Sequence, residues 1–365
     1  MSVVAFYIGY SPYYTSDNWL TPEIAKNIGG SEIATIQVAL HLSKKKNTVV
    51  IFGHHITSEE TTKDGITWKP TAAFDAFNEK NKIDALIIVR YINALVYLKN
   101  VIKIPKIYVW LHDLIVHYSL MGEILPYYAS GIIENFKDHI TAIGCQTPWH
   151  SSFLASNYPS LTNKFIFTPN GVSDELVSCA LNKRSTPQRV PNKFIFASTH
   201  SRGLPELLKL WPEITRRLEN ASLVIYGSAD LPQPVSELVA PFSNVTVKEK
   251  APQLELFKEM QTSDVWFYPT NFEETYCMTA LEAMLAGCLC IFYDVGCLKN
   301  VVNEERGICI PRDVYTSSPE AVVDVVCNAV GNTELKEGLI TNAVKFAKEQ
   351  TWAKRGELWN ELIKS

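Results

Sequence analysis

Apolar runs suited to β-strands alternate with segments of helical period along the whole chain, and this alternation limits the fold most strongly. In the first half the expected strands are Val3–Ile8, Thr48–Phe52, Ala85–Val89, Ile107–Leu111, Ile140–Ile143 and Phe165–Thr168. Helices are expected between them at Ser31–Lys45, Ile92–Asn100 and Pro148–Ser156. Continuously apolar strands separated by helices are typical of a parallel sheet that is covered on both faces.

The same pattern starts again after a polar segment. The second set of expected strands is Phe194–Ala197, Leu223–Tyr226, Val245–Val247, Val265–Tyr268, Leu289–Tyr293 and Gly307–Ile310, with helices at Pro205–Leu218, Gln253–Gln261 and Thr279–Ala286. Residues 182–192 are polar, contain two prolines and lack an apolar period, which favours a linker.

The 365 residues are also more than one hydrophobic core usually holds. We therefore predict two doubly wound α/β domains, residues 1–180 and 193–350, joined by a linker at 181–192. An amphipathic helix at 351–364 is expected to pack back on the first domain.

Composition excludes several classes of function. The net charge of −4 argues against nucleic acid as a partner, although a small anion such as a diphosphate needs only local donors. Eight cysteines are scattered without a CxxC pair, which indicates a reducing compartment, so we expect a cytoplasmic protein. We find no apolar run long enough to span a membrane, while peripheral membrane contact through a surface patch stays open.

Gly29 and Gly30 directly precede a predicted helix. Paired glycines let the backbone approach a ligand closely, and the helix N-terminus offers N–H groups to an anion. The alternative is a tight turn with Ser31 as the N-cap. The loop before them, residues 9–28, holds Tyr10, Tyr13, Tyr14 and Trp19, which suit either a sugar face or packing on the domain.

Two strand ends carry further candidates. His112 follows Ile107–Leu111 and should reach the ligand-binding edge of the sheet, with Asp113 either orienting its imidazole or capping the next helix. Arg202, followed by Gly203, lies at the first strand-to-helix turn of the second domain. Its guanidinium matches phosphate oxygens in shape and charge. The alternative is a surface arginine beside a glycine turn, which would have the same sequence.

The segment from Ser263 to Gly287 is the most informative. A buried strand ends at Pro269, Glu274 lies in the following loop, and Glu282 is expected in the first helical turn. Carboxylates here suit recognition of sugar and ribose hydroxyls, whereas acids in a first turn are also common partners of the helix dipole.

This segment resembles the Glu-x7-Glu signature of the retaining glycosyltransferases called family 4, which have the GT-B fold. Landmarks shared with that family occur in order along nearly the whole chain: Gly29-Gly30, Thr168–Val172, Pro269-Thr270, Glu274, Leu281–Met284, Gly287, Asp294–Gly296 and Arg306-Gly307. The resemblance implies two Rossmann-like doubly wound domains facing each other across a cleft. It also implies transfer of a hexose from a UDP- or GDP-sugar to a glycan, lipid or other hydroxyl acceptor.

The resemblance further implies a role for each matching residue. His112, Glu274 and Arg202 would be catalytic: His112 near the transferred sugar, Glu274 on the donor sugar and Arg202 on the departing diphosphate. The donor-binding set would be Gly29, Gly30, Arg202, Thr275, Tyr276, Cys277, Met278 and Glu282, with Glu282 on the ribose. The Asp-x-Asp metal motif is missing, so we expect no metal and no cofactor.

Several positions depart from the family pattern. Thr275 and Cys277 stand where the family has glycines, Cys297 stands for a third glycine and Asn300 for a frequent glutamate, and His200 is the only other basic residue near Arg202. These changes keep open a degenerate protein that binds a nucleotide sugar without turnover. A GT-B epimerase or phosphorylase is the third alternative.

Overall fold

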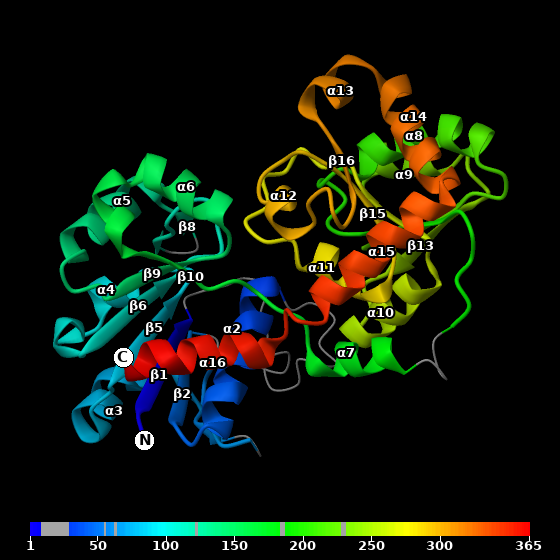
Figure 1. Ribbon diagram of the computed structural model, residues 1–365. Helices are drawn as coiled ribbons and strands as arrows, with labels where there is room; N and C mark the ends of the chain where they lie inside the picture. The colour runs from blue at the N-terminus through cyan, green and yellow to red at the C-terminus, as the bar shows by residue number, and fades with distance from the viewer. Residues whose placement is uncertain (9–28, 55, 62–63, 121–122, 183–186, 228–230) are drawn as a thin grey trace. The chain divides into compact units, whose positions relative to one another are not determined.

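The computed structural model describes residues 1–8, 29–54, 56–61, 64–120, 123–182, 187–227 and 231–365. The chain forms two compact units, the first made of Met1–Gly171 with Trp352–Ser365 and the second of Val172–Thr351. Each unit is built on its own sheet (Figure 1). The predicted pair of α/β domains with parallel sheets is confirmed.

The sheet of the first unit has the strand order β10-β9-β6-β5-β1-β2-β4-β3. All pairs are parallel except β3–β4. The strands are β1 (Val3–Ile8), β2 (Thr48–Gly53), β3 (Glu60–Thr61), β4 (Ile66–Pro70), β5 (Ala85–Val89), β6 (Lys106–Trp110), β9 (Ala142–Cys145) and β10 (Phe165–Phe167). Two further short strands, β7 (Ser119–Leu120) and β8 (Glu123–Ile124), form an antiparallel pair. Because β1 pairs with both β2 and β5, the strand order reverses at β1.

The helices of the first unit connect these strands, except for the C-terminal helix. They are α2 (Gly30–Lys44), α3 (Phe74–Asn81), α4 (Ala94–Tyr97), α5 (Pro126–Phe136), α6 (Pro148–Asn157) and α16 (Trp352–Lys364), with 3₁₀ turns η1 (Thr71–Ala73), η2 (Val101–Lys103) and η3 (Pro159–Lys164). Strand residues such as Val50, Ile88 and Val109 are fully buried and form the core with residues of these helices. Burial on both faces explains why the strands read as uninterrupted apolar runs.

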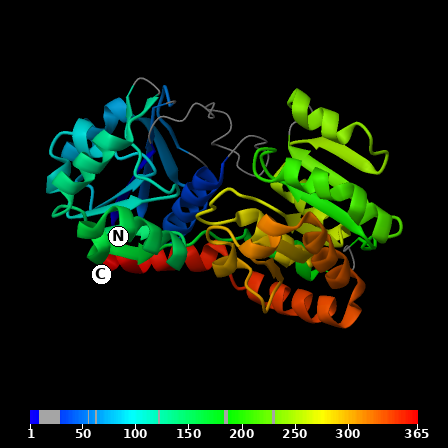
Figure 2. The ribbon, with the colours of Figure 1, turned by 90° about the horizontal axis from the view of Figure 1, so that it is seen from above.

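The C-terminal helix α16 lies beside α2 (Figures 1 and 2). A Cβ at Gly356 would lie 2.3 Å from Cβ of His41, so only a glycine lets the helices approach this closely. Glu357 on α16 accepts a hydrogen bond from Lys45 Nζ at 2.6 Å. The helix predicted at the C-terminus therefore packs on the first unit.

The sheet of the second unit is parallel throughout, in the order β13-β12-β11-β14-β15-β16. Its strands are β11 (Lys193–Ala197), β12 (Ser222–Gly227), β13 (Val245–Glu249), β14 (Val265–Tyr268), β15 (Leu289–Tyr293) and β16 (Ile308–Ile310). Its helices are α7 (Asp174–Leu181), α8 (Leu204–Arg217), α9 (Gln233–Val239), α10 (Gln253–Thr262), α11 (Met278–Ala286), α12 (Leu298–Val301), α13 (Arg312–Ser317), α14 (Pro319–Gly331) and α15 (Thr333–Ala347). This doubly wound order reverses between β11 and β14, where ligands of such sheets bind.

The unit boundary differs from the predicted one. The chain enters the second unit at Val172 rather than after residue 180, because α7 packs against α10 and α11. It returns after Thr351, and the Val172 N–H donates to the Gln350 carbonyl at 2.8 Å, so the two crossings lie side by side. The end of the predicted linker is fixed as well, since Arg189 donates to the carbonyls of Ser263 and Ala286.

One smaller expectation was wrong, and one strand was not predicted. The helix predicted at Ile92–Asn100 contains only α4, because Leu98 is extended and Asn100 adopts a left-handed conformation with φ 57°. Strand β4 was not predicted: it is short and ends in a proline, and only alternate residues, Ile66 and Trp68, are buried.

Candidate active site

Arg202 lies on the loop that leads from β11 into α8, at the point where the second sheet reverses its strand order. Gly203 follows it with φ 103°, and a Cβ there would lie 2.6 Å from the carbonyl oxygen of Pro269. The glycine therefore allows the loop after β11 to touch the loop after β14. This contact brings the sequence-predicted residues Arg202 and Glu274 together.

Glu274 is the centre of a hydrogen-bonded group. Arg202 Nη1 donates to its Oε1 at 3.0 Å, and the Tyr268 hydroxyl donates to the same oxygen at 2.8 Å. The Glu274 side chain is 10% exposed and that of Arg202 36%. The Arg202 guanidinium also lies 3.9 Å from the ring centroid of Phe272. A guanidinium has five N–H donors and uses one here, so it can bind an anion without leaving the carboxylate.

The backbone of Glu274 is held by the turn after β15. Cys297 N–H donates to the Glu274 carbonyl at 2.9 Å. Gly296 has φ 57°, and a Cβ there would lie 2.7 Å from the Glu274 nitrogen. The Asp-Val-Gly turn thus fixes the position of Glu274.

Helix α11 begins at Met278, and the side chain of its N-cap residue Cys277 makes no capping hydrogen bond. Uncapped N–H groups at a helix start are suited to an anion. Thr275 and Tyr276 immediately precede this start, so the predicted donor-binding residues from Thr275 to Met278 form one stretch around it.

Glu282 is the fifth residue of α11, so its predicted place in the first turn was wrong. The helix starts one residue earlier than expected, and Glu282 therefore lies one turn further in. It is 6% exposed and accepts a hydrogen bond from Gln253 Nε2 at 2.5 Å. Burial raises the pKa of its carboxyl to about 7, against the opposing effect of the Gln253 bond. Glu274 and Glu282 thus have different partners and different environments.

In the first unit, His112 follows β6, with its ring centroid 4.8 Å from that of Trp110. Its Nδ1 lies 3.2 Å from Nε2 of Gln146, which follows β9. Burial is the main cause that lowers the pKa of His112 to about 3; Asp113 opposes this effect, and the charges of Arg90 and His150 add to it. The imidazole is therefore neutral at physiological pH.

Asp113 was expected to orient His112 or to cap a helix, but its carboxylate pairs with Arg90. Arg90 Nε and Nη2 donate to its two oxygens, the second at 2.9 Å. This pairing lowers the pKa of Asp113 although burial alone would raise it. Arg90 adopts φ 67° directly after β5, a left-handed conformation that non-glycine residues rarely take. Sequence reasoning missed Arg90, although a basic residue at a strand end was a usable signal.

Gly29 is the N-cap of α2, and Gly30 is its first residue. The alternative with Ser31 as N-cap was wrong, because Ser31 lies inside the helix and its hydroxyl donates to Glu32 at 2.5 Å. As a glycine, the N-cap of α2 has no side chain to cap the first turn, so this helix start is similar to that of α11. The aromatic loop residues Tyr10, Tyr13, Tyr14 and Trp19 lie outside the described residues.

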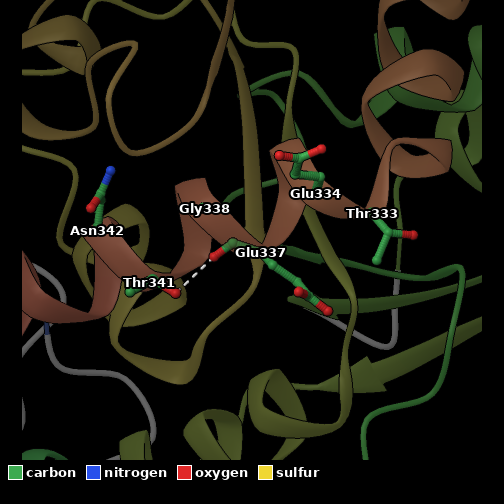
Figure 3. A pocket seen from close by; sticks show the side chains of 6 residues that line it. All are labelled: Thr333, Glu334, Glu337, Gly338, Thr341 and Asn342. Carbon is green, nitrogen blue, oxygen red and sulfur yellow. Dashed lines mark hydrogen bonds between the residues drawn. The ribbon is translucent and has the colours of Figure 1, made fainter.

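The side chains of α15 line a separate surface cavity of about 610 Å³ (Figure 3). Its lining residues are Thr333, Glu334, Glu337, Gly338, Thr341 and Asn342. It has two carboxylates and no basic side chain, so it is unsuited to a diphosphate, and it shares no residue with the groups above.

The described residues contain no group of three or more His, Cys, Asp or Glu side chains placed to hold a metal ion. None of the helices within those ranges has the length and apolar character needed to cross a membrane.

Comparison with known proteins identifies a domain within the second unit and the fold of the whole chain. Residues 191–332 match the family described as glycosyl transferases group 1. Over its full length the chain superposes on a sucrose-phosphate synthase from Thermosynechococcus elongatus with a TM-score of 0.75 and 15% identity, covering 100% of this chain and 98% of that one. Residues 191–332 thus carry the glycosyl transferases group 1 domain, and the whole chain has the GT-B fold.

Two curated proteins and one further solved structure are also similar to this chain. An uncharacterized glycosyltransferase of Methanocaldococcus jannaschii is 29% identical over 43% of this chain and 40% of its own length. A phosphatidyl-myo-inositol mannosyltransferase of Mycobacterium leprae is 20% identical over 58% and 59%. The matches thus span about half of each relative. An Anabaena protein solved with UDP and glucose has a TM-score of 0.65 at 10% identity and full coverage of both chains.

Proposed function

We propose that this GT-B protein is a retaining, family 4-like glycosyltransferase that moves a hexosyl group from a UDP- or GDP-sugar to a hydroxyl of a glycan or lipid acceptor. We propose further that it needs no metal ion. The observation that carries the proposal is the Arg202–Glu274 pair beside an uncapped helix start, at the switch point of the second sheet.

In this proposal the second unit binds the donor. Arg202 and the first N–H groups of α11 neutralise the diphosphate, which gains charge as the bond to the sugar breaks. Glu274, fixed by Tyr268 and by the turn at Gly296, accepts hydroxyl groups of the donor sugar. Glu282, which is buried in α11, accepts the hydroxyls of the ribose.

The reaction needs no covalent protein intermediate. The bond between the anomeric carbon and the phosphate oxygen breaks, and its electron pair leaves with the nucleoside diphosphate. The acceptor oxygen bonds to the anomeric carbon on the same face, and its proton passes to the departing phosphate oxygen. Positioning and charge stabilisation would supply the catalysis. His112, in the first unit, is assigned to the transferred sugar and the acceptor.

Names of related proteins support the substrate classes. The mycobacterial relative is a mannosyltransferase, which supports transfer of a hexose, and the Anabaena structure holds UDP and glucose, which supports a UDP-sugar. All eight cysteines are free thiols, which supports a cytoplasmic location.

A panel of UDP- and GDP-sugars in EDTA tests the proposal. We expect one donor to raise the melting temperature, since saturation at 100 times Kd adds about 2.7 kcal/mol of stability. We also expect release of the nucleoside diphosphate from that donor without added metal. Binding without release, with or without acceptors, would favour the degenerate binding protein instead. Release that appears only after Mg²⁺ or Mn²⁺ is restored would overturn the metal-independent mechanism.

A further inference from the structure

The environment of His112 contains a residue that the sequence did not single out. Strands β6 and β9 are parallel neighbours, with Trp110 opposite Gly144. His112 and Gln146 each follow their strand by one or two residues, so both lie at the same edge of the sheet. Gln146 is 1% exposed, and its amide nitrogen lies 3.2 Å from both the Leu111 carbonyl oxygen and His112 Nδ1.

The Leu111 contact fixes which way the Gln146 amide points. A carbonyl oxygen only accepts hydrogen bonds, so the atom facing it must be the amide nitrogen and not the amide oxygen. That nitrogen has two hydrogens, one for Leu111 and one for His112. His112 Nδ1 must therefore accept, and a neutral imidazole with Nδ1 as acceptor has its proton on Nε2.

Asp113, Arg90 and His150 are the titratable neighbours that act on His112 among the described residues. His150 is fully buried, its Nδ1 accepts from the Gln146 backbone N–H at 3.2 Å, and its Nε2 donates to the Asp113 carbonyl at 2.9 Å. Both nitrogens of His150 are thus engaged. Arg90 and Asp113 neutralise each other as a two-contact ion pair.

We propose that Gln146 is a positioning residue that holds His112 in the Nε2–H tautomer, so that His112 acts as a neutral hydrogen-bond donor and not as a general base. The natural acceptor for this N–H is an oxygen of the donor sugar or of the acceptor molecule. Only that last step rests on the proposed function, because the tautomer is a property of the protein alone.

Nitrogen NMR of the full chain with ¹⁵N-labelled histidine tests the tautomer without substrate. The His112 signals are identified by their loss in His112→Asn. We expect Nδ1 to be unprotonated and Nε2 protonated from pH 6 to 8. In Gln146→Met the donor to Nδ1 is lost, so a share of the His112 side chains should become protonated on Nδ1. Protonated Nδ1 in the wild type, or the wild-type protonation pattern in Gln146→Met, would overturn the proposal.

Measurement of turnover provides a second test. If Gln146 had only a structural role, kcat would not fall selectively in its variant. Gln146→Met should lower kcat about five- to tenfold, the value of about one hydrogen bond, with the donor KM changed less than about twofold. The same change in a His112→Asn background should have no further effect, whereas an additive loss would overturn the proposal. Gln261→Met, at another buried glutamine in α10, is the matched control and should leave the His112 signals unchanged. If the wild type turns over no donor, the proposed function fails, while the NMR experiment still decides the tautomer.

Discussion

Arg202 Nη1 lies 3.0 Å from Glu274 Oε1 and joins the loop after β11 to the loop after β14. The cation is the more exposed partner, and the carboxylate is buried under it. An anionic ligand can therefore reach the Arg202 guanidinium, and the hydrogen bond to Glu274 holds that guanidinium in place before the ligand binds.

Replacing Arg202 by alanine should weaken the binding of UDP or GDP about 10- to 100-fold, because one charge-assisted hydrogen bond contributes about 1.5–3 kcal/mol. Arg202→Lys should recover part of the loss, since it keeps the charge but not the fork of donors. Isothermal titration measures both. Arg216→Ala, on the exposed far end of the same helix, is the control and should bind normally. Equal affinities for wild type and Arg202→Ala would remove Arg202 from the site.

Gly296→Ala should reduce donor turnover about 10- to 100-fold, because the added Cβ pushes on the Glu274 backbone and small misplacements are costly in catalysis. The left-handed backbone adds a stability loss of roughly 1–2 kcal/mol. Gly331→Ala, where a Cβ meets nothing within 4 Å, should keep both turnover and stability. Chemical unfolding and a donor-release assay compare the pair. Full activity in Gly296→Ala would show that the turn does not position Glu274.

Glu282 predicts a specific pH dependence of stability. Its folded pKa of about 7 lies above the ordinary 4.5, so the folded state holds this proton more tightly than the unfolded state. Its contribution to stability is therefore lost as the pH rises from about 4.5 through 7, up to about 3 kcal/mol in all. Glu282→Gln lacks this loss, so its unfolding free energy relative to wild type should be higher at pH 8 than at pH 5. Urea unfolding at the two pH values measures it, and an equal difference at both would contradict the buried, protonated carboxyl.

Donor binding should depend on the same group. Ribose hydroxyls bind the ionised carboxylate best, so wild-type affinity for a UDP-hexose should rise between pH 6 and pH 8. A UDP-hexose has no terminal phosphate that titrates in this range, so a change in affinity would come from a group on the protein. Glu282→Gln should show a flat profile, and a rise of the same size in this variant would place the titration elsewhere.

Gly356→Ala should destabilise the first unit by about 1–3 kcal/mol, because the new methyl would overlap His41 where α16 meets α2. Gly338→Ala in α15, with open space around it, should instead be neutral or gain up to about 1 kcal/mol. Thermal unfolding of both variants checks the prediction. A stable Gly356→Ala protein would mean that the two helices are not in close contact.

Local patterns were enough to predict most of the fold. Strands such as Val3–Ile8 and Leu289–Tyr293 are buried on both faces. Their sequences are therefore apolar at nearly every position, which made them easy to predict. The boundary at Val172 could not be seen, because it depends on α7 packing against helices some 75 to 110 positions later. Strand β4 ends in a proline and buries only every second residue, so it lacked the signal of its neighbours.

The site was predicted less evenly than the fold. Arg202 and Glu274 were chosen separately, and the structure pairs them through Gly203 and Gly296, whose role is visible only in three dimensions. Arg90 was missed because its partner Asp113 lies 23 positions away. Gln146 was missed because one glutamine after a strand matches no motif, although the parallel pairing of β6 and β9 brings it to His112.

The most direct test of the central claim follows the anomeric proton of the transferred sugar by ¹H NMR in EDTA, with wild type, Arg202→Ala and Glu274→Ala. We predict that the wild type releases the sugar, or transfers it, in the anomeric configuration that it has in the donor. Both variants should do so at least about tenfold more slowly. Inverted product, or wild-type rates in both variants, would contradict the account.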